Sequence, residues 1–138
     1  MSNTRLLVLT GLLAMLLSSA SCFSQGSGSA YYDAGAQDLN VTGEQMATYV
    51  IFRFDTGTGG RTMRLPSAAD ITSQIGSPTV GQIFIMAVSA DGSNPVSVVG
   101  GSGVTVKASA AEVAGNSTQN LYFVLMDTTA GSQAIIVY

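Results

Sequence analysis

The feature that most constrains the fold is a series of short β-branched and aromatic runs separated by turn residues. Runs of this kind suit a pleated, half-buried strand. They fall at 49–54, 61–65, 83–88, 96–99, 104–107, 121–126 and 134–138, with a weaker one at 111–113. Strands of this length and spacing predict an all-β domain, an antiparallel β-sandwich or jelly-roll-like barrel.

Two pairs of runs are predicted to form hairpins. The segment 55–60 is rich in threonine and glycine and separates the first two runs, which favours a hairpin over 49–65. The segment 100–103 is Gly-Gly-Ser-Gly and separates the runs at 96–99 and 104–107 in the same way.

One short helix is expected after Pro66, which ends the second run. Ser67 can cap the helix with Asp70 three residues later, and Ile71 and Ile75 then share one face. The helix is predicted over roughly 68–75, with 76–78 ending it. The chain thus divides into a hydrophobic leader at 1–23, a Gly/Ser linker and irregular arm at 24–47, and the β-sandwich domain at 48–138.

The predicted core uses one apolar face of several strands. Its members are Ile51, Phe84, Met86, Val98, Val106, Phe123, Leu125, Ile135 and Val137. A domain of about 90 residues buries a marginal core. The runs at 83–88 and 121–126 are nearly continuous in apolar residues, which indicates strands covered on both faces, one by the core and one by a neighbour. We therefore predict a homo-oligomer; the resemblance described below implies a trimer.

The amino-terminal segment is predicted to be a hydrophobic helix. One positive charge, Arg5, precedes an apolar run that begins at Leu6 and ends at Leu17, and small residues follow. This order is typical of a cleaved secretory signal peptide. Two alternatives remain open: a retained anchor that contacts a membrane through this run, and a helix packed inside an assembly.

Cys22 is the one cysteine of the chain, so no internal disulfide can form. The sequence Ser19-Ala20-Ser21-Cys22 resembles a bacterial lipobox, which would make Cys22 a lipidation site. The alternative is that Cys22 is an inert thiol.

Composition narrows the possible functions. The chain has no histidine and no tryptophan, and 9% of its residues are charged. These counts exclude histidine-based acid–base or nucleophilic catalysis and His/Cys zinc sites. The net charge of −3 argues against nucleic-acid binding. Because the acidic residues are scattered singly and there is no histidine, we expect no metal site. We also expect no cofactor and no enzymatic activity.

Five residues are candidates for an interface. Arg53, Arg61 and Arg64 fall in the predicted 49–65 hairpin, where they form either a solvated face or a contact with an acidic neighbour. Tyr31 and Tyr32 follow the linker in polar surroundings and could anchor an interface or dock onto the domain.

The segment from Arg61 to Tyr138 resembles a trimeric β-domain of tailed-phage virion proteins, of the head-decoration, head-fibre and minor tail or fibre type. Four motifs carry the resemblance, in order along the chain, before a last strand that ends at Val137-Tyr138. They are Leu65-Pro66-Ser67-Ala68, Pro78-Thr79-Val80-Gly81, Gly101-Ser102-Gly103-Val104-Thr105-Val106 and Ala114-Gly115-Asn116-Ser117.

The resemblance implies a virion structural protein displayed on the particle surface. Its partners would be copies of itself and capsid or other virion proteins, and its role would be to stabilise the particle or mediate attachment. The leader suggests an alternative, an exported bacterial β-sandwich lipoprotein or adhesin of the cell envelope or extracellular space.

Overall fold

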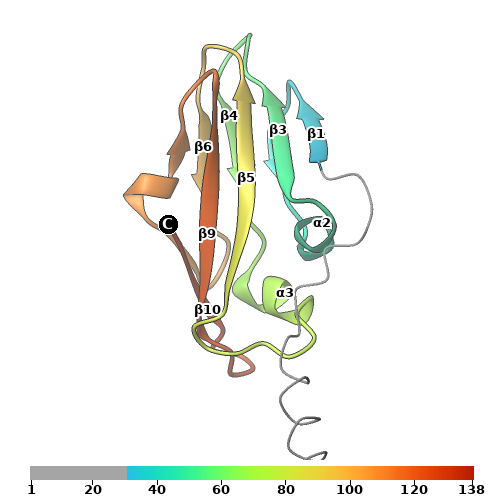
Figure 1. The fold of residues 1–138 in the computed structure, drawn as a ribbon, viewed down its shortest axis with the longest axis vertical. Coiled ribbons are helices and arrows are strands. Elements are labelled where there is room, and N and C mark those ends of the chain that lie inside the picture. Colours follow the sequence, from blue (N-terminus) through green and yellow to red (C-terminus); the bar gives the residue numbers. More distant parts are fainter. Residues whose placement is uncertain (1–30) are drawn as a thin grey trace, which may run out of the picture.

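Two β-sheets face each other across a single core in the computed structural model, which describes residues 31–138 (Figure 1). The predicted leader helix, the Gly/Ser linker and Cys22 lie outside the described residues. The elements in chain order are β1 (Tyr31–Gly35), β2 (Leu39–Asn40), α2 (Gly43–Thr48), β3 (Ile51–Asp55), β4 (Arg61–Arg64), α3 (Ala68–Ser73), β5 (Ile83–Asp91), β6 (Val96–Val99), β7 (Val104–Val106), a 3₁₀ turn (Ala108–Ala110), β8 (Glu112–Val113), β9 (Ser117–Asp127) and β10 (Ala134–Val137).

Successive strands alternate between the two sheets. The larger sheet has the order β1-β3-β5-β9-β10-β7 and the smaller one β2-β4-β6-β8. From β1 to β9 each strand therefore belongs to the other sheet from the strand before it, and β10 then pairs with β9 in the larger sheet. Residues 31–138 are mostly β, with two short α-helices and two mixed sheets.

The prediction of an antiparallel sandwich is wrong in strand direction, and the jelly-roll-like connectivity fails with it, since jelly rolls are antiparallel. Five of the eight pairings among the described strands are parallel, including β1 with β3, β3 with β5 and β4 with β6. The chain leaves one sheet, adds a strand to the other sheet, and returns to pair with its earlier strand in the same direction, as β5 does with β3. The two segments predicted as hairpins, 49–65 and 96–107, are therefore connections between the sheets.

The segment 55–60 shows why a turn-rich sequence misled the prediction. It carries the chain from β3 in the larger sheet to β4 in the smaller one. The backbone N–H of Thr56 donates to Asp91 O at 3.1 Å, while that of Arg61 donates to Pro95 O at 3.0 Å. A connection between sheets needs the same glycines and hydroxyl residues as a hairpin turn, so composition does not separate the two.

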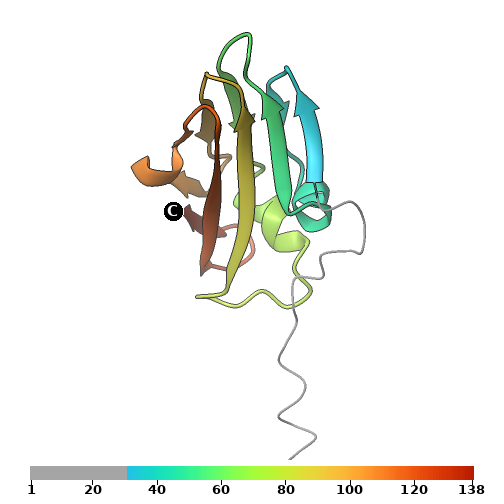
Figure 2. The ribbon, with the colours of Figure 1, turned by 45° about the horizontal axis from the view of Figure 1, so that its top comes forward.

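Two helices close one end of the sandwich, and they contact each other (Figures 1 and 2). Ser67 caps α3 as predicted, because its hydroxyl accepts from the Asp70 N–H at 3.1 Å. The second helix, α2, lies in the segment predicted as an irregular arm. Thr42 and Gln45 form a reciprocal capping box there, with bonds of 2.9 and 3.1 Å.

The core confirms most of the predicted members, but β3 faces the other way. Met86, Val98, Phe123, Leu125, Ile135 and Val137 are buried, and Phe84 and Val106 pack partly buried against them. On β3 the core residues are Phe52 and Phe54, while Ile51 points outward. Residues 31–47 also contribute core side chains, Val41 and Met46, so they are part of the same packed unit.

Candidate functional site

The outer face of the six-stranded sheet carries one row of polar side chains that crosses four strands. Asp33 on β1 is paired in register with Arg53 on β3, Arg53 with Ser89 on β5, and Ser89 with Thr118 on β9. Residues paired in this way point to the same face of a sheet. We call these four residues, with Asp91 two positions further along β5, the polar row.

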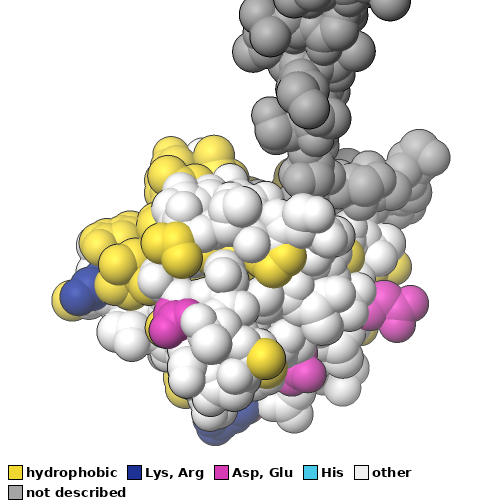
Figure 3. All heavy atoms as spheres, turned by 90° about the horizontal axis from the view of Figure 1, so that it is seen from below, with side chains coloured by type: hydrophobic (Ala, Val, Ile, Leu, Met, Phe, Trp, Pro, Cys, Tyr) yellow, Lys and Arg dark blue, Asp and Glu magenta, His cyan; other side chains and the backbone are white. Residues whose placement is uncertain are grey.

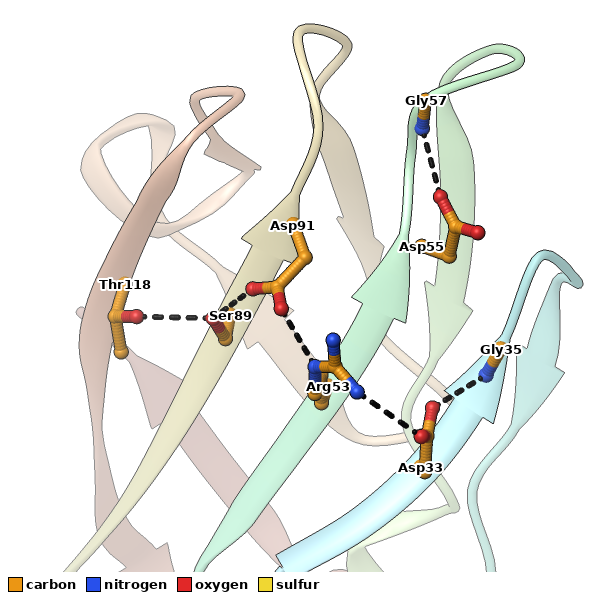
Figure 4. Close-up of polar contacts among 8 residues, drawn as sticks. All are labelled: Asp33, Gly35, Arg53, Asp55, Gly57, Ser89, Asp91 and Thr118. Carbon is orange, nitrogen blue, oxygen red and sulfur yellow. Dashed lines mark hydrogen bonds and ion pairs between the residues drawn. The ribbon is translucent and has the colours of Figure 1, made fainter.

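Hydrogen bonds connect every member of the polar row (Figure 4). Arg53 donates from Nε to Asp91 Oδ2 at 2.5 Å and from Nη1 to Asp33 Oδ2 at 3.2 Å. The hydroxyl of Ser89 donates to Asp91 Oδ1 at 2.9 Å and accepts from Thr118 Oγ1 at 3.0 Å. Hydrogen bonds between side chains thus link β1 to β3, β3 to β5 and β5 to β9.

Electrostatics keep both ends of the central ion pair charged. The hydrogen bond from Arg53, followed by that from Ser89, lowers the pKa of Asp91 below its ordinary value. The same contact with Asp91 raises the pKa of Arg53. Both side chains remain two-fifths or more exposed, so water screens the pair and its contribution to stability is small.

The polar row offers hydrogen-bond donors and acceptors to a ligand. The hydrogen bonds from Arg53 and Ser89 that lower the pKa of Asp91 also make its carboxylate a weaker base toward the Ser89 hydroxyl. Within residues 31–138 no group of three or more His, Cys, Asp and Glu could hold a metal ion. The polar row therefore presents solvent-exposed hydrogen-bond donors and acceptors in fixed positions, which suit a polar ligand.

The other end of the same face is apolar. Ile85 on β5 lies opposite Tyr122 on β9, and Tyr122 exchanges two backbone hydrogen bonds with Tyr138, at 2.9 and 3.0 Å. One row further, Val124 lies between Ile83 and Ile136. We define the apolar patch as Ile83, Ile85, Tyr122, Val124, Met126, Ile136 and Tyr138.

The apolar patch is open to solvent in the described part of the chain. Ile83 is 58% exposed, Ile85 48% and Tyr122 44%. These side chains belong to β5 and β9, whose alternate residues, such as Phe123 and Leu125, fill the core. Figure 3 looks at the lower end of the molecule and shows hydrophobic side chains gathered on one side of it.

The structure does not bring the three predicted interface arginines together. Arg53 projects from the larger sheet, whereas Arg61 and Arg64 lie on β4 in the smaller one. Arg61 bonds within its own connection, from Nε to Asp55 O at 3.1 Å and from Nη2 to Thr58 Oγ1 at 2.7 Å. Arg64 is exposed and lines a cleft of about 590 Å³ with residues of α2, α3 and the 99–101 segment.

The two predicted tyrosines differ from each other. Tyr32 points inward and packs edge-on against Tyr49, with ring centroids 5.3 Å apart, and against Phe52 at 5.7 Å. Tyr31 points outward beside the polar row and is 50% exposed. Tyr31 is therefore available to a partner, whereas Tyr32 is docked on the domain.

Sequence reasoning missed most of the polar row. Asp33, Ser89, Asp91 and Thr118 are scattered over 86 positions, and their neighbourhood depends on a register that crosses four strands. The local signal was present on β5, where apolar and polar residues alternate from Val88 to Asp91 and so predict an exposed polar side.

Two of the four motifs that carry the resemblance to phage virion proteins contact each other in the structure. The Ala68 N–H donates to Ser102 O at 2.8 Å, and a Cβ on Gly101 would lie 2.5 Å from Pro66 O. A Cβ on Gly103, which has φ +74°, would meet Gln133 O at 2.6 Å. Two of the motifs therefore pack on each other, and their glycines are needed for that close approach.

Comparison of the chain with models of protein families, with curated proteins and with solved structures finds no match. No helix within residues 31–138 is both long enough and apolar enough to cross a membrane.

Proposed function

We propose that the protein is a non-enzymatic structural component of a phage virion, displayed on the particle surface, and that its β-domain assembles with copies of itself into a trimer. The apolar patch is the observation that carries this proposal. Five of its seven members are exposed and the other two, Val124 and Ile136, are partly buried. A small domain with such a patch on one sheet gains free energy by covering it. The resemblance of residues 61–138 to virion β-domains supplies the setting.

A second copy of the chain fits the apolar patch better than a charged partner does. The patch lies on β5, β9 and β10, which pair antiparallel as neighbours in one sheet, and none of its seven members is charged. An acidic or basic partner surface would lose water there without gaining a counter-charge. The apolar patch of a second copy has no charges to desolvate, so burying the two patches avoids this loss. The patch therefore suits self-association.

The mass of the protein in solution tests this proposal. We expect light scattering to give three times the single-chain mass for the full chain in detergent, after correction for bound detergent. The fragment 31–138, which contains every described core residue, should give the same stoichiometry without detergent. A single-chain mass for the fragment at micromolar concentration would overturn the proposal.

The sequence around Cys22 favours an alternative, an exported bacterial lipoprotein or adhesin of the cell envelope. Intact-mass spectrometry of protein from its native source separates the two. Acyl mass on Cys22 would support the lipoprotein, whereas loss of the first 20 or 21 residues without acylation would indicate export of a soluble domain. An intact amino terminus would leave the leader as an anchor or assembly helix.

A further inference from the structure

We propose that the polar row and the two apolar side chains beside it form a binding site for a neutral saccharide. The site lies on the outer face of the larger sheet, at the end away from the apolar patch. It is a shallow hollow of about 440 Å³ lined by Tyr31, Ile51, Arg53, Ser89, Asp91 and Thr118. It does not depend on the proposed self-association.

The lining divides into an apolar and a polar half, as a sugar ring does. Tyr31 and Ile51 are paired in register on β1 and β3, so their side chains lie next to each other. The Tyr31 ring is half exposed. A pyranose carries C–H groups on its faces and hydroxyl groups around its rim, so a face can pack on Tyr31 and Ile51 while the rim reaches the polar row.

The polar row offers donors and acceptors that are already held in place. Arg53 uses two of its N–H groups on Asp91 and Asp33, and the other guanidinium N–H groups have no bond to the described residues. Asp91 is held by Arg53 and Ser89 and keeps lone pairs free. A sugar hydroxyl both donates and accepts, so it can bind such a pair without new ordering of side chains.

The charge of the site selects against anionic ligands. Two carboxylates, Asp33 and Asp91, are bound to the one guanidinium, Arg53, so the site has a net negative charge. Asp55 lies in register with Asp91 on the neighbouring strand and adds a further acid nearby. A phosphate or a carboxylated sugar would face uncompensated acids. The favoured ligand is therefore an uncharged hexose unit, either free or in a polysaccharide.

Saturation-transfer NMR on the full chain, in a detergent without a sugar headgroup, tests the site. The probes are the methyl glycosides of glucose, galactose, mannose and N-acetylglucosamine, with the methyl glycoside of sialic acid as the anionic comparison. We expect at least one neutral probe to bind with a dissociation constant of about 1 mM, the value for some 13 non-hydrogen atoms at ordinary ligand efficiency. The strongest transfer should reach its ring C–H protons.

Variants locate the binding. Tyr31→Ala should weaken binding at least tenfold, Tyr31→Phe should keep it, and Arg53→Lys should weaken it because the two-pronged contact with both carboxylates is lost. Tyr122→Ala, a tyrosine of similar exposure in the apolar patch, is the matched control and should bind normally. The proposal is overturned if none of the neutral probes binds, if Tyr31→Ala binds as wild type, or if the sialoside binds most tightly. Light scattering on the same samples reports self-association separately.

Discussion

The two ends of the outer face of the larger sheet are built by neighbouring strands, yet they present opposite chemistry. At one end the polar row links four strands by hydrogen bonds between exposed side chains. At the other end the same β5 and β9 expose isoleucine, tyrosine and methionine. The row of Tyr31, Ile51, Ala87 and Asn120 lies between them.

The difference shows that the outer face of one sheet can change from polar to apolar along the length of the same strands, and not only from one strand to the next. Both ends rest on the same core, so packing beneath the sheet does not explain the change. The side chains of the polar row hydrogen-bond to one another and to water, so they are stable when exposed. An apolar patch of this size is stabilised when another surface buries it. The polar end is therefore suited to a small ligand and the apolar end to another protein surface.

The comparison depends on which residues of the larger sheet face the solvent, and substitutions on β3 test this assignment. Phe52→Ala should destabilise the domain by about 3–5 kcal/mol, because Phe52 is fully buried. Ile51→Ala, one residue away on the outer face, should cost about 1 kcal/mol or less. Urea unfolding followed by circular dichroism, at one fixed protein concentration, measures both. Equal costs for the two variants would contradict the assigned orientation of β3.

A buried hydroxyl next to the polar end gives a smaller effect of opposite sign. The side chain of Thr56 is fully buried, and its hydroxyl has no hydrogen-bond partner among the described residues. Thr56→Val should therefore stabilise the protein by about 1 kcal/mol, since it removes an unsatisfied polar group at nearly constant volume. Thermal unfolding measures this, and a lowered melting temperature would show that the hydroxyl is bonded after all.

Acid should affect the polar end weakly and in a definite direction. Because the folded-state pKa of Asp91 is lowered, its contribution to stability is present above the ordinary aspartate pKa and is lost as pH falls through the folded value. Asp91→Asn should reduce the loss of stability on acidification from neutral pH to about pH 3, and added salt should reduce it in the wild type. Thermal melts at several pH values measure the difference. An unchanged pH profile in Asp91→Asn would mean that the ion pair does not form in solution.

The sequence allowed the strands to be predicted better than their arrangement. The runs at 96–99 and 134–138 became β6 and β10 almost residue for residue, because β-branched composition is a local property. Strand direction is not local. The connection at 55–60 looks the same whether it closes a hairpin or crosses between sheets, and this one choice turns antiparallel neighbours into parallel ones.

The candidate site was harder to predict for the same reason. Arg53 and Tyr31 were identified from their residue types, but their partners depend on register. On β3, Phe52 and Phe54 alternate with the charged Arg53 and Asp55, a pattern that indicates a core face through Phe52. The prediction that Ile51 faces the core was wrong because it overlooked this alternation. The surplus of apolar residues on β5 and β9 was visible in sequence, and it predicted that their second faces would need cover.

The most direct measurement of the central claim is the sedimentation of two matched tyrosine variants beside the wild type. Tyr122→Asp places a charge in the apolar patch, and Tyr31→Asp places the same charge at a position of similar exposure outside the patch, beside the polar row. A charge without a partner in a buried interface costs about 3–5 kcal/mol, which is more than a hundredfold in association. We expect the wild type and Tyr31→Asp to sediment as trimers and Tyr122→Asp as a folded monomer. A monomeric wild type, or a Tyr122→Asp variant that keeps the trimer mass, would contradict the account.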